Sequence, residues 1–176
     1  ITYNKWGQIE TQTDPLGNVL NNTYDNWGKL LKSKTNLSGY TTYSYEKTSL
    51  GDAVVTQYNP DGGQKISYTN KFGQNYKSTT KNFGQGKYVS AMIVYDAIGR
   101  KIGESEPFSS GLSATQWNFI YYDDYSRPIK ATSFIGKVVE TTYNDRGRTV
   151  TVTETNANNR FKKQTADPIG NIISSE

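Results

Sequence analysis

The chain has 176 residues, with 20 Lys and Arg against 16 Asp and Glu, and it contains neither Cys nor His. The lack of both residue types excludes disulfides, Cys-based zinc sites and every catalytic arrangement that depends on histidine. Leu, Ile, Val and Phe together supply only 34 residues, whereas there are 14 Tyr and 3 Trp. This composition is typical of a polar β protein whose aromatic side chains supply the buried area.

A four-residue turn pattern recurs along the whole chain. Its clearest copy lies in YDAIGR, Tyr95–Arg100, where an Asp is followed three residues later by a Gly. Asp at the first position of a type I turn accepts backbone hydrogen bonds, and Gly at the fourth position adopts positive φ at no steric cost. We call this four-residue unit a tip, and we predict that each tip is the turn of a β-hairpin.

From residue 1 to residue 80 the tips follow one another in steps of 10 to 12 residues. Each step leaves about seven residues between two tips, which is the length of an ordinary strand. Helical periodicity is absent, so these intervening segments are predicted to be β-strands. The tips of this part begin at Asn4, Asp14, Asp25, Asn36, Thr48, Asn59 and Asn70.

The middle of the chain is less regular. Degenerate tips at Lys81 and Phe108 keep the Gly but lose the capping residue, and each is followed by an interval of 15 residues. These intervals must hold longer strands, bulges or loops, and the residues do not decide between the three. Gly103–Ser113 has the Pro, Ser and acidic residues of a solvated loop. The aromatic run WNFIYY that follows is predicted to place Trp117, Phe119 and Tyr121 on one face.

Regular spacing returns in the last part, with tips at Asp123, Ser133, Asn144, Asn156 and Asp167. Ser126 and Asn159 replace Gly, and of these two residue types Asn tolerates the left-handed region better. The whole chain is therefore predicted to be all-β, a continuous antiparallel meander of about fourteen strands. Open sheets rarely exceed about ten strands without curling, so we expect a curled or spiralling sheet. We treat residues 1–176 as a single repeat array.

Alternate tips fall on opposite edges of such a ribbon. On the first edge the tip is usually preceded by Tyr, so tyrosines form a column, and the full repeat is a hairpin of about 21 residues. The residues of this repeat motif are Tyr3, Gly7, Tyr24, Asp25, Gly28, Tyr95, Asp96, Gly99, Tyr122, Asp123, Tyr143, Asn144 and Gly147. Because the chain begins within one repeat and stops within a strand, we expect it to be a segment of a longer protein. Unpaired edges on its terminal strands predict edge-to-edge self-association.

Five stretches together resemble RHS repeats, which are also called YD repeats. They are YDNWGK at Tyr24, YDAIGRK at Tyr95, YNDRGR at Tyr143, DPLGN at Asp14 and DPIGN at Asp167. The resemblance covers essentially the whole chain, although the copies at Tyr45, Tyr68 and Tyr122 are degenerate. It implies hairpins wound in a spiral into a hollow β-shell.

In bacterial toxin complexes and polymorphic toxins, shells of this family enclose a C-terminal toxic polypeptide. In animal teneurins a related shell belongs to an adhesion receptor. The family's terminal core region with its self-cleaving aspartates has no counterpart here, since Asp14 and Asp167 stand in turns of ordinary repeats. The resemblance therefore implies a structural role, without catalytic residues.

Two sets of aromatic residues are candidates for a ligand surface. Trp6 and Trp27 share the third tip position, and Trp117 lies in the run WNFIYY. A row of aromatics could stack on sugar rings, but for Trp6 and Trp27 we favour packing between repeats, because an apolar residue recurs at the third tip position in step with the repeat. We favour packing for the run WNFIYY as well.

Catalytic, nucleic-acid and membrane functions have little support. Asp123 and Asp124 are adjacent, but successive residues usually point apart and no second acid cluster accompanies them. The pI of about 9.1 comes from charges that do not cluster, which argues against nucleic-acid binding. No run of 18 apolar residues is present, so no membrane span is expected. No residue pattern indicates a cofactor or a metal.

These observations favour a non-enzymatic wall segment of a secreted or cell-surface bacterial RHS protein. Its expected partners are other repeats of the same parent chain and an enclosed polypeptide cargo. The alternative is a carbohydrate-binding or cell-adhesion module, which requires solvent-facing, coplanar aromatics at the tips. An enzyme would require a deep pocket with facing carboxylates.

Overall fold

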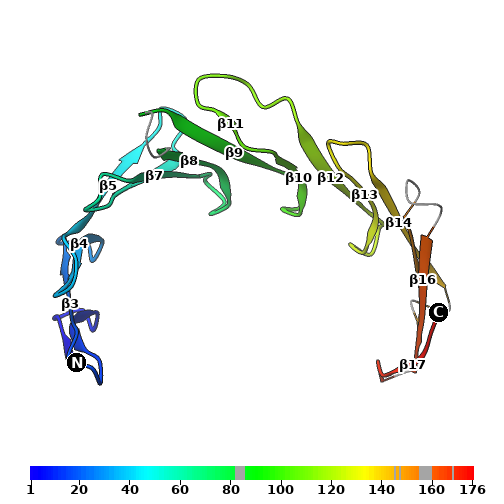
Figure 1. Ribbon diagram of the computed structural model, residues 1–176, viewed down its shortest axis with the longest axis horizontal. Coiled ribbons are helices and arrows are strands. Elements are labelled where there is room, and N and C mark those ends of the chain that lie inside the picture. Colours follow the sequence, from blue (N-terminus) through cyan, green and yellow to red (C-terminus); the bar gives the residue numbers. More distant parts are fainter. Residues whose placement is uncertain (82–85, 145, 147, 155–159, 168) are drawn as a thin grey trace. The chain divides into compact units, whose positions relative to one another are not determined.

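The computed structural model describes residues 1–81, 86–144, 146, 148–154, 160–167 and 169–176, and its regular elements are 17 β-strands (Figure 1). The strands are β1 (Thr2–Tyr3), β2 (Ile9–Thr13), β3 (Val19–Tyr24), β4 (Leu30–Thr35), β5 (Thr41–Lys47), β6 (Ala53–Tyr58), β7 (Gln64–Thr69), β8 (Asn75–Lys81), β9 (Tyr88–Tyr95), β10 (Lys101–Ser105), β11 (Phe108–Ser109), β12 (Trp117–Tyr122), β13 (Pro128–Thr132), β14 (Val138–Asn144), β15 (Thr149–Glu154), β16 (Arg160–Ala166) and β17 (Ile172–Ser175).

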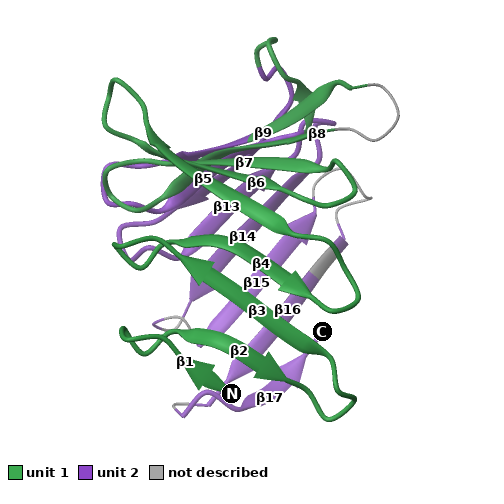
Figure 2. Ribbon diagram, turned by 90° about the vertical axis from the view of Figure 1, so that its left-hand side faces the viewer, with its two compact units in different colours: residues 1–91, 107–113 green, residues 92–106, 114–176 purple. Residues whose placement is uncertain are grey.

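The chain divides into two compact units, which Figure 2 shows in different colours. Unit 1 comprises residues 1–91 and 107–113, and unit 2 comprises residues 92–106 and 114–176. In unit 1 the strands from β1 to β8 pair in chain order, each antiparallel to the next. In unit 2 the strands from β12 to β17 do the same. The predicted all-β antiparallel meander of hairpins is confirmed.

The first long interval contains β9, which contributes to both units, and the second contains β11 and the connection of residues 110–116 to β12. In unit 2, β10 pairs with the second part of β9 on one side and with β12 on the other. In unit 1, β11 pairs with the first part of β9, where Phe108 lies opposite Ser90. The prediction of a solvated loop over 103–113 is therefore wrong at both strands.

Close packing explains why this segment is ordered. A Cβ on Gly103 would lie 3.1 Å from the ring of Phe119, so the glycine makes room for the neighbouring strand. The Ser105 side chain is only 4% exposed, and its hydroxyl accepts a hydrogen bond from the backbone N–H of Met92 at 2.9 Å. The loop was predicted because Pro, Ser and acidic residues are common in solvated loops. Residue type alone does not show whether such residues contact a neighbouring strand.

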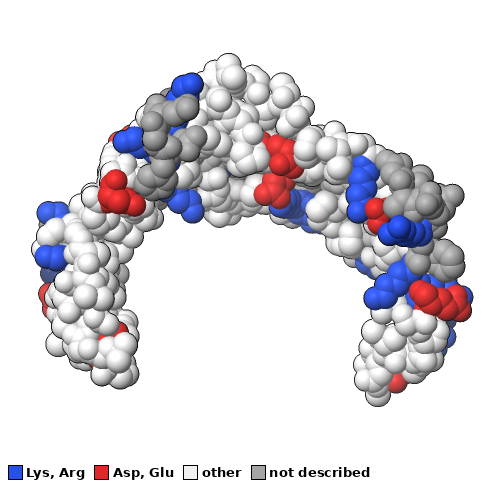
Figure 3. All heavy atoms as spheres, in the orientation of Figure 1, with Lys and Arg blue, Asp and Glu red and all other residues white. Residues whose placement is uncertain are grey.

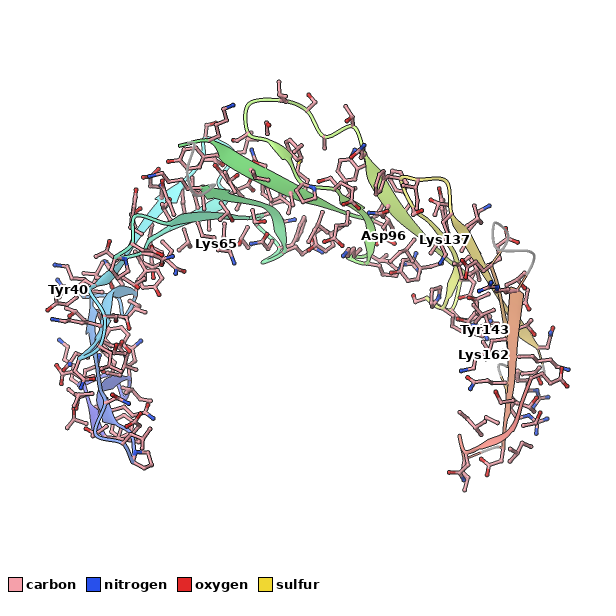
Figure 4. All side chains as sticks on the ribbon, viewed as in Figure 1. Tyr40, Lys65, Asp96, Lys137, Tyr143 and Lys162 are labelled. Atoms are coloured by element: carbon pink, nitrogen blue, oxygen red, sulfur yellow. The ribbon has the colours of Figure 1, made fainter. Side chains whose placement is uncertain are left out.

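Neither unit has an apolar core in the part of the chain that the structure describes. No apolar side chain there is buried. The buried polar side chains are Thr56, Thr79, Ser90, Ser105 and Thr149. Figure 4 shows side chains standing on both faces of the strands in each unit. We expected the aromatic side chains to supply the buried area, but those described are half-buried at most. The contacts between successive hairpins must therefore hold the fold together.

Candidate functional site

The hairpin tips have one backbone geometry in both units. The N–H of tip position 1 donates to the carbonyl of the residue after the tip, and the N–H of position 4 donates back to the carbonyl of position 1, at 2.8 to 3.1 Å. This is a type I turn followed by a left-handed residue, a common hairpin connection. Among the described residues, the tips with both bonds begin at Asn4, Asp14, Asp25, Thr48, Asn59, Asn70, Asp96, Asp123, Ser133 and Asp167.

The side chain at position 1 caps most of these turns as predicted. One side-chain oxygen of Asp96 accepts hydrogen bonds from the backbone N–H groups of Ile98 at 3.1 Å and Arg100 at 2.9 Å. The same pair of bonds forms at the tips that begin at Asn4, Asp14, Asp25, Asn70, Asp123 and Asp167. At position 4, Gly99 has a φ of +90°.

At six of the described tips, the second polar atom of the position 1 side chain bonds to the side chain of the residue directly after the tip, which we call the fifth position. Asp96 Oδ2 accepts a bond from Arg100 Nε at 2.6 Å, and Asp123 Oδ2 accepts one from Arg127 Nε at 2.7 Å. Sequence reasoning missed this pairing, although the signal is present in the complementary residue types at positions 1 and 5 of these tips. Asn–Gln and Asp–Asn pairs replace the ion pair at Asn4, Asp14, Asn70 and Asp167.

These bonds shift the acidity of the tip carboxyls. The Asn18 side chain and backbone lower the pKa of Asp14, and Asn171 does the same for Asp167. Partial desolvation raises the pKa of Asp96, but the hydrogen bonds and the charge of Arg100 outweigh it, so the pKa is lowered. The pKa of Asp123 is lowered in the same way, because the hydrogen bonds from Arg127 outweigh the desolvation that raises it.

Four tyrosines tether their hairpin repeats to the preceding ones. The hydroxyl of Tyr122 donates to the carbonyl of Lys101 at 2.9 Å, and that of Tyr143 donates to the carbonyl of Pro128 at 2.9 Å. Both acceptors stand two residues after the tip of the preceding repeat. Tyr24 and Tyr45 make the same bond in unit 1, to the carbonyls of Ile9 and Leu30, both at 2.8 Å.

The fifth-position cation covers the ring of the same tyrosine. The guanidinium of Arg100 lies 4.7 Å from the ring centre of Tyr122, and that of Arg127 lies 4.4 Å from Tyr143. Lys29 lies 5.2 Å from Tyr45. We call this arrangement the tyrosine clasp. It consists of the tip acid, the fifth-position cation, and the tyrosine of the next repeat with its carbonyl acceptor.

Tyr45 was not among the predicted motif residues, because Lys47 and not Tyr45 directly precedes its tip. It nevertheless stands one repeat of 21 residues after Tyr24, and this spacing could have identified it. Burial raises the pKa of the Tyr45 hydroxyl, with smaller contributions from Tyr43 and Asp25. Of the other predicted members, Tyr95 is half-buried and Tyr3 is 59% exposed.

Three predicted tips depart from the pattern. The N–H of Asn36 bonds to the carbonyl of Val19, and Gly39 has no positive φ. A Cβ on Gly39 would lie 2.7 Å from Pro60, so this glycine provides space. The turn predicted at Phe108 begins one residue later, where the N–H of Leu112 bonds to the carbonyl of Ser109.

At Asn144 the strand continues through the predicted first tip position, because Asn144 pairs with Thr149. The left-handed residue there is Arg146, with a φ of 60°. The predicted motif residue Gly147 lies outside the described residues, as do Gly84 and Asn159 of the degenerate tips. Ser126, by contrast, takes the place of Gly with a φ of 63° and keeps both turn bonds.

The candidate ligand aromatics differ in exposure. Trp6 is 58% and Trp27 is 88% exposed, so neither packs between repeats within this chain, and our packing interpretation is wrong for this pair. Trp117 is half-buried, its ring stacks on Phe119 at 6.1 Å between centres, and its indole N–H donates to the carbonyl of Ala114 at 3.2 Å.

The acidic residues do not form a catalytic or metal-binding arrangement where the structure describes them. The described residues include no group of three or more Asp or Glu that could hold a metal ion. The Asp123 carboxylate is engaged by the backbone and side chain of Arg127, while Asp124 is exposed. No helix within the described ranges has the length and apolarity to cross a membrane.

Comparison with known proteins gives a likeness among solved structures. No family model and no curated protein matches the chain. Among solved structures, the chain is similar to one in the crystal structure of TcdB2-TccC3-Cdc42, with a TM-score of 0.72 and 19% identity over 95% of this chain. The chain spans 10% of that chain's length. The likeness concerns the fold, and it supports the RHS-like β-fold that the repeat motif implies.

Proposed function

We propose that this chain is a wall segment of a hollow RHS-type β-shell that encloses a polypeptide cargo. The observation that carries the proposal is the tyrosine clasp in units without an apolar core. A sheet that is held by contacts between successive repeats extends by adding repeats, and it needs no second layer on either face. Both faces then stay available, one toward solvent and one toward an enclosed volume.

The similar solved structure supports this role. Its name joins TcdB2 and TccC3, its chain is far longer than this one, and 95% of our chain matches one part of it. A long array of which this chain is one stretch can enclose a volume that 176 residues cannot. The motif resemblance to bacterial toxin complexes further favours a secreted or cell-surface bacterial protein, with the remaining repeats of the parent chain as partners.

We further propose that the segment is not itself an enzyme and does not bind nucleic acid. The tip carboxylates with lowered pKa values are all engaged by backbone N–H groups and fifth-position side chains. They cap turns and are not poised for proton transfer. On the face that Figure 3 shows, the Lys and Arg side chains form separate groups, some of them beside Asp or Glu, on a largely uncharged surface. A nucleic-acid site would need a continuous basic stripe.

The test is limited proteolysis of the full-length parent protein, followed over time by intact mass. Enclosure predicts that the polypeptide beyond the repeats survives while free linkers are cut. The control is the same parent unfolded in urea and then diluted into protease, in which that polypeptide must be digested. If the polypeptide is digested in the native parent while the repeats resist, the array is an open scaffold and the proposal is wrong.

A further inference from the structure

Two exposed indoles stand side by side on the first edge of unit 1. They belong to the tip between β1 and β2 and the tip between β3 and β4, which are neighbours on this edge (Figure 2). The backbone under each indole is fixed by its cap, because the N–H of Trp6 bonds to Asn4 Oδ1 at 2.9 Å and that of Trp27 bonds to Asp25 Oδ1 at 2.8 Å. Both rings are thus presented from rigid turns.

A side-chain bond joins these two tips directly. Gln8 Nε2 donates to the carbonyl of Gly28 at 2.7 Å, while Gln8 Oε1 accepts a bond from Asn4 Nδ2 at 3.1 Å. Gly28 leaves room for this amide, since a Cβ there would approach both Gln8 amide atoms to 3.3 Å. The spacing between the two tips, and hence between the indoles that they carry, is therefore set by the fold.

The indoles flank a cavity of about 350 Å³ that is lined by Trp6, Gln8, Asn26, Trp27 and Gly28. We call it the tryptophan pocket. Its volume lies at the lower end of the range of about 300 to 1,000 Å³ that is typical of small-molecule sites. Its lining thus combines two apolar indole side chains with the amide side chains of Gln8 and Asn26 and with Gly28.

The lining decides the chemical class of the ligand. None of its five lining residues carries a charge, so the lining itself offers no counter-charge to an ion, and the Lys5 ammonium beside it is engaged by the ring of Trp6. Lys5 Nζ already lies 5.0 Å from the ring centre of Trp6, so a second cation at that indole would be repelled. A neutral ligand with one apolar face and a rim of hydroxyls satisfies both the indole walls and the amides.

We propose that the tryptophan pocket binds a neutral pyranose sugar, stacked on the indoles and hydrogen-bonded by the side chain of Asn26. This role is independent of the wall function, because the pocket lies on one edge of unit 1 and involves no cargo. Sugar binding at tip aromatics requires that they face solvent, and the 58% and 88% exposure of the two indoles meets that requirement.

The test follows the indole N–H signals of the ¹⁵N-labelled 176-residue chain during titration. The signals of Trp6 and Trp27 are assigned with Trp→Phe variants, and Trp117 serves as an internal reference. The probes are the methyl glycosides of glucose, galactose, mannose and N-acetylglucosamine, each up to about 50 mM because single sugars at shallow sites bind in the millimolar range. Glycerol, which has hydroxyls but no ring face, is the control for nonspecific effects.

We expect at least one pyranoside to shift the Trp6 and Trp27 signals saturably and to leave Trp117 unchanged. Trp27→Ala should weaken binding about tenfold or more, because truncation of an aromatic anchor removes most of a small site's affinity. Phe72→Ala, at the same tip position two repeats later, should leave it unchanged. Both substituted side chains are strongly exposed, so the variants should keep the wild-type circular dichroism.

Three results would overturn the proposal. The first is the absence of a saturable shift with any of the four pyranosides. The second is a shift with tetramethylammonium at lower concentration than with any sugar, which would make the pocket a cation site. The third is a shift of the Trp27 signal, whose tip does not adjoin the edge strand β1, on raising the protein concentration without sugar, which would mean that a second copy of the chain occupies the pocket.

Discussion

Removal of the tyrosine hydroxyls from the clasps of unit 2 should destabilise that unit. Tyr122→Phe deletes the bond to the carbonyl of Lys101, and Tyr143→Phe deletes the bond to the carbonyl of Pro128, both 2.9 Å long. The phenyl ring keeps the contact with the cation above it, so each substitution removes the hydroxyl alone.

The magnitude follows from the general strength of such bonds. A neutral hydrogen bond within a protein contributes about 1 kcal/mol net, and more when its loss leaves a buried acceptor unpaired. Each substitution should therefore lower the free energy of unfolding by about 1 kcal/mol. Tyr122 and Tyr143 bond to carbonyls of different hairpins, so the double variant should lose about 2 kcal/mol if the two sites are independent.

The assay is urea unfolding followed by tryptophan emission in a Trp6→Phe, Trp27→Phe background. Trp117 is then the sole reporter, and it is half-buried in unit 2. The control is Tyr125→Phe, because that tyrosine lies in the same unit, is 81% exposed, and has a cation 5.2 Å from its ring. If Tyr122→Phe and Tyr125→Phe unfold at the same urea concentration, the clasp does not hold the repeats together.

Three further predictions concern the tips and the edges. Ser126→Gly should be more stable than Ser126→Ala by about 1 kcal/mol in urea, because both lose the bond from Arg100 but only Gly relieves the φ of 63°; equal stability would contradict this. The lowered pKa values of the tip carboxyls mean that the folded state binds fewer protons than the unfolded state, so their contribution is present above about pH 3.9 and is lost as the pH falls through the folded pKa values. Urea midpoints that stay constant from pH 5 to pH 2.5 would refute this. Finally, among the described strands β1 pairs with β2 alone and β17 with β16 alone, so light scattering should show association that grows with concentration, and a strict monomer would speak against it.

The repeating turns could be predicted from sequence because their chemistry is local. An Asx side chain and a left-handed residue three positions later suffice to specify the hairpin, and tips such as that at Asp96 form as expected. Gly39 shows the limit of this reasoning. The sequence does not distinguish a glycine that is required for space, as Gly39 is beside Pro60, from a glycine that is required for positive φ. Only the position of the neighbouring segment distinguishes the two.

The clasp could be predicted only in part. The column of tyrosines was visible, but their hydroxyl acceptors are backbone carbonyls, which no residue letter encodes. The tyrosine that Arg100 contacts, Tyr122, lies in the next repeat, so this contact depends on the register between the strands. The exposure of Trp27 was misjudged for a related reason, because periodicity places a residue on a tip but does not say whether another segment covers it.

The most direct test of the account is a structure of the full-length parent by electron cryomicroscopy. The account predicts that residues 1–176 lie within the wall of a closed shell, as a single layer whose two faces look outward and into an enclosed volume that contains density for the cargo. A second sheet or a helical layer packed against this segment, or an array that does not close, would contradict it.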